Sequence, residues 1–174
     1  MCVMTEPRVE KCQFFFLTAH KKCEGLVENY CGHMHKDYTS EQERYWNIAS
    51  FFIPKIPEGA KVFIEDYSFG SKGRVFHIAE NTGILKHFLW EAGHSFTTVP
   101  PTVIKKFATG KGNADKAKMY EAFVRETNLN VIQYYSKTGK LDSPVTDMVD
   151  AYYIAKWGYH NVSGSVGCKE TEAE

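Results

Sequence analysis

Short apolar runs separated by amphipathic stretches organise this chain. Residues 12–18 are dense in aromatic side chains and predict a strand, and residues 1–5 predict another strand that pairs with it as a hairpin. Residues 62–64 form a continuous run of strand formers, which is typical of a strand buried on both faces of a sheet. Because this run ends in Glu65 and Asp66, we expect carboxylates at a strand's carboxyl end, where sites of open α/β sheets lie.

Helices are expected between and after these strands. Ser40 and Glu43 form a capping-box pattern ahead of an amphipathic stretch that leads to Pro54. A second helix is expected over residues 74–92, with Gly93 as its stop. Three further elements complete the prediction: a short strand over residues 95–99, a helix capped by Asn113 and running through Val124, and a helix that begins at Ser143-Pro144.

Length and charge describe an ordinary globular chain. Its 174 residues correspond to about one domain. The 21 basic and 21 acidic residues balance, so the overall charge does not indicate nucleic-acid binding, and only a local basic surface could do so.

The cysteines and the lengths of the apolar segments indicate the cellular compartment in which the protein is expected. The five cysteines are odd in number and include no CxxC pair, which argues against a disulfide framework and favours a reducing compartment. No apolar run approaches the roughly 18 residues of a membrane span, and no signal-peptide pattern opens the chain. We therefore expect a cytoplasmic protein that makes no membrane contact.

Residues 103–118 carry a local excess of positive charge. Gly110 and Gly112 in this segment allow backbone amides to approach an anion closely. A flexible solvated loop is the alternative interpretation. Asp115 is the acidic residue opposed to the lysines of this segment, which are Lys105, Lys106, Lys111, Lys116 and Lys118.

Asp147 and Asp150 are three residues apart and therefore lie on one face of the last predicted helix. They border an inward-packing stripe, and acids this close repel each other unless a cation lies between them. Alternatively, both aspartates only favour the amino end of the helix through its dipole. The residues of the stripe are Met148, Ala151, Tyr152 and Ala155.

Three of these pieces together resemble the RuvC-like Holliday-junction resolvases of the RNase H-like nuclease superfamily, particularly the phage forms. Their order and separations agree with that family, and the resemblance covers roughly residues 45–158. It implies an α/β fold with an RNase H-like mixed sheet flanked by helices, in a single domain over residues 1–158. The Gly, Ser and Glu content after that domain predicts a flexible acidic tail over residues 159–174. The matching pieces are Val62-Phe63-Ile64-Glu65, the basic run from Val103 to Lys116, and Asp147-Met148-Val149-Asp150-Ala151.

The resemblance implies a catalytic role for five residues. Glu65, Asp147 and Asp150 match metal-coordinating carboxylates that hold Mg2+ or Mn2+ for phosphodiester hydrolysis. Lys105 and Lys116 match family lysines near the scissile phosphate, where their charge serves an anionic transition state.

The resemblance also implies a partner, branched DNA such as a four-way junction, and a homodimer that cuts two symmetric strands. The helix after Glu65 is the expected dimer interface. Tyr67 and Phe69 are candidates for an aromatic wedge that stacks on a base at the crossover. The lysines expected to bind DNA are Lys72, Lys105, Lys106, Lys111 and Lys116.

The chain departs from the family at its start. Family members begin with a central strand that ends in an aspartate, whereas residues 1–5 resemble the family's second strand, and neither Glu6 nor Glu10 matches the aspartate's position. The first, central strand is therefore expected to be missing, which leaves the strand over residues 62–65 with an unpaired buried edge.

Three functions stay open on these residues. The first is a Mg2+-dependent structure-selective endonuclease that resolves Holliday or other branched junctions. The second is a non-cleaving branched-DNA-binding module derived from such a nuclease. The third is a protein whose acids and lysines only pair with each other on the surface.

Overall fold

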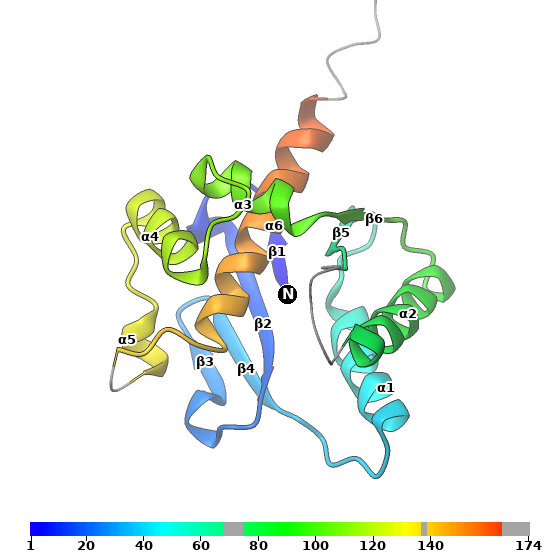
Figure 1. The fold of residues 1–174 in the computed structure, drawn as a ribbon. Coiled ribbons are helices and arrows are strands. Elements are labelled where there is room, and N and C mark those ends of the chain that lie inside the picture. The colour runs from blue at the N-terminus through cyan, green and yellow to red at the C-terminus, as the bar shows by residue number, and fades with distance from the viewer. Residues whose placement is uncertain (68–74, 137–138, 165–174) are drawn as a thin grey trace, which may run out of the picture.

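Six strands form two separate sheets in the computed structural model, which describes residues 1–67, 75–136 and 139–164 (Figure 1). The first sheet has the order β1-β2-β4-β3, and the second pairs β5 with β6. The strands are β1 (Cys2–Met4), β2 (Cys12–Thr18), β3 (Gly25–Val27), β4 (Tyr30–Met34), β5 (Val62–Glu65) and β6 (Phe96–Val99).

The first sheet begins with the predicted hairpin. β1 pairs antiparallel with β2, with Cys2 opposite Phe14, so this prediction is confirmed. Strand β2 then pairs in parallel with β4, which in turn pairs antiparallel with β3. Every second residue of β2 is buried, starting at Cys12, as expected for a strand with one face on the core.

The second sheet contains the strand that carries Glu65. β5 and β6 are parallel, with Val62 opposite Phe96 and Glu65 opposite Val99. The expectation that β5 is buried on both faces is wrong, because Val62, Phe63 and Ile64 are only half-buried. The reason is that, among the described residues, β5 has a strand neighbour, β6, on one edge only.

Six α-helices and three short 3-10 helices complete the described chain. The Ser40 side chain accepts a hydrogen bond from the Glu43 amide at 3.2 Å, which confirms the predicted cap of α1. Gly93 follows α2 with a φ of 75°, as a helix stop requires. The α-helices are α1 (Glu41–Phe52), α2 (Val75–Glu91), α3 (Pro101–Thr109), α4 (Lys116–Thr127), α5 (Ile132–Tyr135) and α6 (Val145–Gly164), and the 3-10 helices are η1 (Val9–Lys11), η2 (Lys21–Cys23) and η3 (Ile53–Lys55).

Two helix boundaries differ from the predictions. Asp115, and not Asn113, caps α4, because a turn buries Ala114 in the core and the helix starts after it. Helix α6 continues to Gly164, past the expected start of the tail at Tyr159. Beyond Tyr159, the ring of His160 lies 5.9 Å from that of Phe107 in α3.

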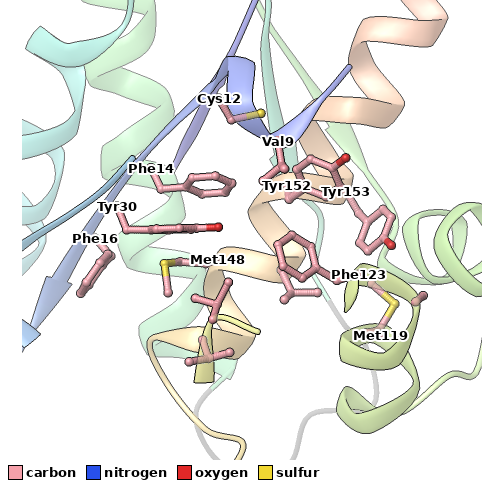
Figure 2. Packing of buried hydrophobic residues seen from close by; sticks show 14 of the residues in the cluster. Val9, Cys12, Phe14, Phe16, Tyr30, Met119, Phe123, Met148, Tyr152 and Tyr153 are labelled. Carbon is pink, nitrogen blue, oxygen red and sulfur yellow. The ribbon is translucent and has the colours of Figure 1, made fainter. Parts of the chain in front are cut away.

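The main core lies between the first sheet and helices α4 and α6 (Figure 2). Phe14 of β2 stacks on Tyr30 of β4 at 4.8 Å, and Phe123 of α4 meets the ring of Tyr152 of α6 edge-on at 5.3 Å. Aromatic rings therefore connect the sheet to both helices. None of the helices in the three described ranges is long and apolar enough to cross a membrane.

Helix α6 also contacts the second sheet. A Cβ atom on Gly158 would lie 2.2 Å from a ring carbon of Phe63, so only glycine allows β5 this close to the helix. The rings of Phe63 and Trp157 meet edge-on at 5.9 Å. The two sheets are thus held in place by one helix, which fixes where Glu65 lies relative to the acids of α6 (Figure 1).

Candidate functional site

The three carboxylates predicted as metal ligands come from two elements that pack together. Glu65 is the last residue of β5, and Asp147 and Asp150 lie in the first turns of α6. The last residue of the strand and the first turns of the helix lie within electrostatic reach of each other, since the charges of Asp150 and Asp147 act on Glu65. Glu65 and Asp147 are exposed, and Asp150 is half-buried.

These carboxylates act on one another. Burial raises the pKa of Asp150, and the negative charge of Asp147 raises it further. Although Glu65 is exposed by surface area, the protein atoms around it exclude enough water to raise its pKa, with further increases from Asp150 and Asp147. The cluster therefore holds more negative charge than it accommodates easily, and a cation bound among these oxygens would relieve the repulsion.

Both lysines predicted as catalytic lie at the same site. Lys105 of α3 and Lys116, the first residue of α4, each lower the pKa of Glu65 and of Asp150. Helices α3 and α4 bring them there, because both pack on α6. The structure thus places the other four residues that the sequence marks as catalytic within electrostatic reach of Glu65.

Two hydroxyl groups orient part of the cluster. The Ser143 hydroxyl donates to one carboxylate oxygen of Asp147 at 2.5 Å, and the Thr146 hydroxyl lies 3.4 Å from the other. The Lys116 ammonium donates to the same Thr146 hydroxyl at 3.4 Å. Thr146 is only 4% exposed and was not predicted, because a threonine beside an aspartate in a helix gives no chemical signal in the sequence.

The residues expected to bind DNA are less concentrated. Tyr67 lies just after β5, and the Lys86 ammonium of α2 is 5.1 Å from its ring centroid, a contact that sequence reasoning missed. Lys106 in α3 and Lys111 after it are exposed, and neither is among the charges that act on the acids. Two other expected contacts, Phe69 and Lys72, lie outside the described residues.

The donor set fits a hard divalent cation. Carboxylate oxygens are the ligands that Mg2+ and Mn2+ prefer, and the mutual repulsion of Glu65, Asp147 and Asp150 favours a cation among them. Within residues 1–67, 75–136 and 139–164, no three or more His, Cys, Asp or Glu side chains are already grouped closely enough to hold a metal ion.

Comparison with known proteins adds to this picture. No family model matches the chain. The crossover junction endodeoxyribonuclease RuvC of Synechococcus sp. (strain CC9311) is 32% identical over 93 residues, which are 52% of this chain. The chain spans 58% of that relative's length.

Two solved structures are similar at 16% sequence identity. One is Thermus thermophilus RuvC, with a TM-score of 0.50 over 72% of this chain and 72% of that one. The other is T. thermophilus RuvC in complex with Holliday junction substrate, with a TM-score of 0.52 over 75% of this chain and 77% of that one. The fold is RuvC-like. The predicted resemblance to RuvC and the predicted RNase H-like α/β fold are thus confirmed, while the phage-type subclass and the missing first strand stay predictions.

Proposed function

We propose that this protein is a structure-selective endonuclease that cleaves Holliday or other branched DNA junctions by divalent-metal-dependent phosphodiester hydrolysis. The observation that carries the proposal is the meeting of Glu65, Asp147 and Asp150 with Lys105 and Lys116 on a RuvC-like fold. A relative that bears the name crossover junction endodeoxyribonuclease supports the same chemistry.

The carboxylates would hold the metal. A bound Mg2+ or Mn2+ supplies an activated water and stabilises the leaving oxygen. Glu65 would contribute from the strand end, and Asp147 and Asp150 from the helix. Ser143 and Thr146 would hold Asp147 in orientation, since their hydroxyls contact its two carboxylate oxygens.

The lysines would bind the phosphate that reacts. Lys105 and Lys116 provide positive charge beside the acids, where negative charge develops on the phosphate oxygens during hydrolysis. The contact with Thr146 would limit the positions of the Lys116 ammonium. These lysines would also balance the carboxylates when no DNA is bound.

DNA binding and assembly would extend over the neighbouring surface. Tyr67 and Phe69 would stack on bases, and Lys72, Lys106 and Lys111 would contact phosphates. A homodimer through α2 would place two sites on one junction. Large exposed apolar side chains on this helix support that interface; they are Phe76, Ile78 and Trp90.

Cleavage of a labelled four-way DNA junction with Mg2+ or Mn2+ tests the enzymatic proposal. Glu65→Gln and Asp150→Asn are each expected to lower the cleavage rate by at least about 100-fold. Each removes one negatively charged ligand from the set of carboxylates proposed to hold the metal together. Asp142→Asn is the matched control, since Asp142 is an exposed acid that pairs with Lys140 at 3.2 Å. Unchanged cleavage by the first two variants would show that the assignment of these carboxylates is wrong.

Junction affinity measured over a range of salt concentrations tests the basic residues. Lys105→Ala and Lys116→Ala are each expected to weaken binding and to reduce the slope of log K against log salt by about one. Lys36→Ala, which removes an exposed lysine after β4, is expected to change neither. Lysine-dependent binding without cleavage by the unsubstituted chain would identify the non-cleaving DNA-binding module instead.

A further inference from the structure

Cys31 and His33 of β4 form a pair of a nucleophile and a base outside the candidate site. They are two residues apart on one strand, so their side chains point to the same face of the first sheet. The Sγ atom of Cys31 lies 3.2 Å from Nε2 of His33, within hydrogen-bond distance for sulfur. A thiol in this position can pass its proton to the imidazole when the sulfur attacks an electrophile. The geometry is therefore that of a thiol with its own general base.

The pair is open to solvent. Cys31 is half-buried, His33 is exposed, and the contact between them lies at the surface. Cys12 and Cys23 are only 5% and 3% exposed. Cys2 is half-buried like Cys31, but its thiol forms a hydrogen bond with Cys12. Among the described cysteines, only Cys31 combines access to solvent with a histidine partner.

A positive charge lies on the same face of the sheet. Phe15 of β2 is directly opposite Cys31 in the register, so the two side chains share that face. The Lys55 ammonium of η3 lies 5.8 Å from the centroid of the Phe15 ring and 3.7 Å from that of the Phe51 ring. The Phe51 ring meets the His33 ring edge-on at 4.9 Å. Negative charge that develops on the sulfur therefore forms in a region that also contains a cation, as reactive thiols require.

A disulfide of low molecular weight is the electrophile that suits this pair. Leu26, opposite Cys31 on the edge strand β3, is 69% exposed, so the described chain leaves this side of the sulfur open to a small molecule. Thiols of a reducing compartment form disulfides transiently. A metal ion fits less well, because no three metal-ligating side chains are grouped in the part of the chain that the structure describes.

We propose that Cys31 is a modification site for thiol–disulfide exchange, with His33 as its base. The S–H bond of Cys31 breaks, and the proton moves to Nε2 of His33. The sulfur bonds to one sulfur of the incoming disulfide, whose S–S bond breaks, and the leaving thiolate takes the proton from the imidazole. The products are a mixed disulfide on Cys31 and one free small thiol, so the incoming disulfide is the oxidant. This inference does not depend on the proposed DNA cleavage.

Reaction of the reduced full chain with dithiodipyridine tests the proposal. This disulfide is uncharged at neutral pH, so attraction between charges does not affect its approach. Samples quenched with acid at successive times and analysed by mass spectrometry of their peptides give a rate for each cysteine. Cys31 is expected to react at least about tenfold faster than Cys2, Cys12 and Cys23. A rate for Cys31 no higher than that of the half-buried Cys2 would overturn the proposal.

Two histidine variants identify the base. His33→Asn keeps a polar side chain but removes the base, so it is expected to slow the reaction of Cys31 at least about fivefold. His35→Asn, two residues further along the chain, is the matched control and is expected to leave the rate unchanged. Circular dichroism checks that both variants fold. An equal Cys31 rate in His33→Asn and in the unsubstituted chain would overturn the proposal.

A measurement at about pH 10 separates base catalysis from access to the sulfur. An ordinary thiol, with a pKa of about 8.5, is ionised there without help. The rates of Cys31 in the unsubstituted chain and in His33→Asn are therefore expected to agree at this pH. A difference that persists would show that His33 only controls access to the sulfur, and the proposal would be wrong.

Discussion

The two halves of this molecule are built very differently. The core half, residues 1–34 and 100–164, contains most of the fully buried side chains. The described part of the β5–β6 half, which spans residues 41–99, has few, and it exposes large apolar groups on its helices. The buried ones are Tyr45, Ala49, Leu89 and Val99, and the exposed ones are Trp46, Phe76, Ile78 and Trp90.

This difference shows where folding stability and chemistry lie. The core half contains a buried aromatic cluster of its own, whereas β5 in the other half packs closely on Gly158 of α6. Glu65 belongs to the weaker half, and Asp147 and Asp150 belong to the stronger one. The candidate site therefore forms only while the two halves stay together.

Removing an aromatic ring from each half gives the largest expected contrast. Phe123→Ala is expected to cost about 3–5 kcal/mol of unfolding free energy, because Phe123 is 1% exposed within the core cluster. Phe76→Ala is expected to change stability by less than about 0.5 kcal/mol, because Phe76 is 80% exposed. Urea unfolding measures both, and similar costs would show that the halves do not differ.

A methyl group at the junction of the halves gives the next largest effect. Gly158→Ala is expected to lower the free energy of unfolding by about 1–3 kcal/mol, since the new Cβ would collide with Phe63. It is also expected to speed hydrogen exchange in β5 and β6. Gly83→Ala is the matched control in α2, where a Cβ would meet no atom within 4 Å. The free energy of unfolding of this control variant is expected to rise by up to about 1 kcal/mol, because alanine has a higher helix propensity than glycine. Normal exchange in β5 of the Gly158 variant would mean that this contact does not hold the halves together.

Deleting the same kind of helix cap in each half tests whether they unfold together. Asp115→Ala removes the cap of α4 and is expected to lower global stability by about 1 kcal/mol. Ser40→Ala removes the cap of α1 and is expected to speed local opening of α1 with a smaller global loss. Native-state hydrogen exchange distinguishes local opening from a loss of global stability. An equal loss of global stability in both variants would show that the two halves unfold as one cooperative unit.

The smallest effect concerns charge between the halves. Burial and Asp147 raise the pKa of Asp150, so the folded state favours the protonated acid, and stability from this group falls as the pH rises through the raised pKa. Asp150→Asn is therefore expected to raise the melting temperature of metal-free protein slightly at pH 7. The gain should vanish below about pH 3.9, the ordinary pKa of an aspartate, where the acid is neutral in both states. A gain that persists at lower pH would mean that charge is not its cause.

Local signals in the sequence predicted individual elements well. The aromatic run at Cys12–Thr18, the cap at Ser40 and the strand at Val62–Glu65 are each fixed by neighbours close in the chain, so the pattern was sufficient. The five catalytic candidates were found because three motifs resemble one family. Their meeting in space agrees with that resemblance, although their roles stay predictions.

Features that depend on distant contacts could not be predicted in this way. The residues near β5 do not themselves indicate its sheet, because strand partners are chosen across the fold; only the resemblance predicts an unpaired edge for this strand. The cap at Asp115 follows from the burial of Ala114, and nothing in the sequence near Tyr159 indicated that α6 continues to Gly164. Thr146 acquires its contacts to Lys116 and Asp147 only when α4 reaches α6.

Because Gly158 packs closely on Phe63, a rotation of α6 about this contact would displace the start of the helix relative to β5. Asp150 lies about 12 Å along the helix axis from this contact. A tilt of about 10° around the contact would therefore move Asp150 by about 2 Å relative to Glu65. Displacements of about 1 Å are enough to change catalytic rates substantially. The packing of a glycine near the end of α6 thus sets the distance between Asp150, near the start of that helix, and Glu65. Small changes in the angle between the two halves would change this distance.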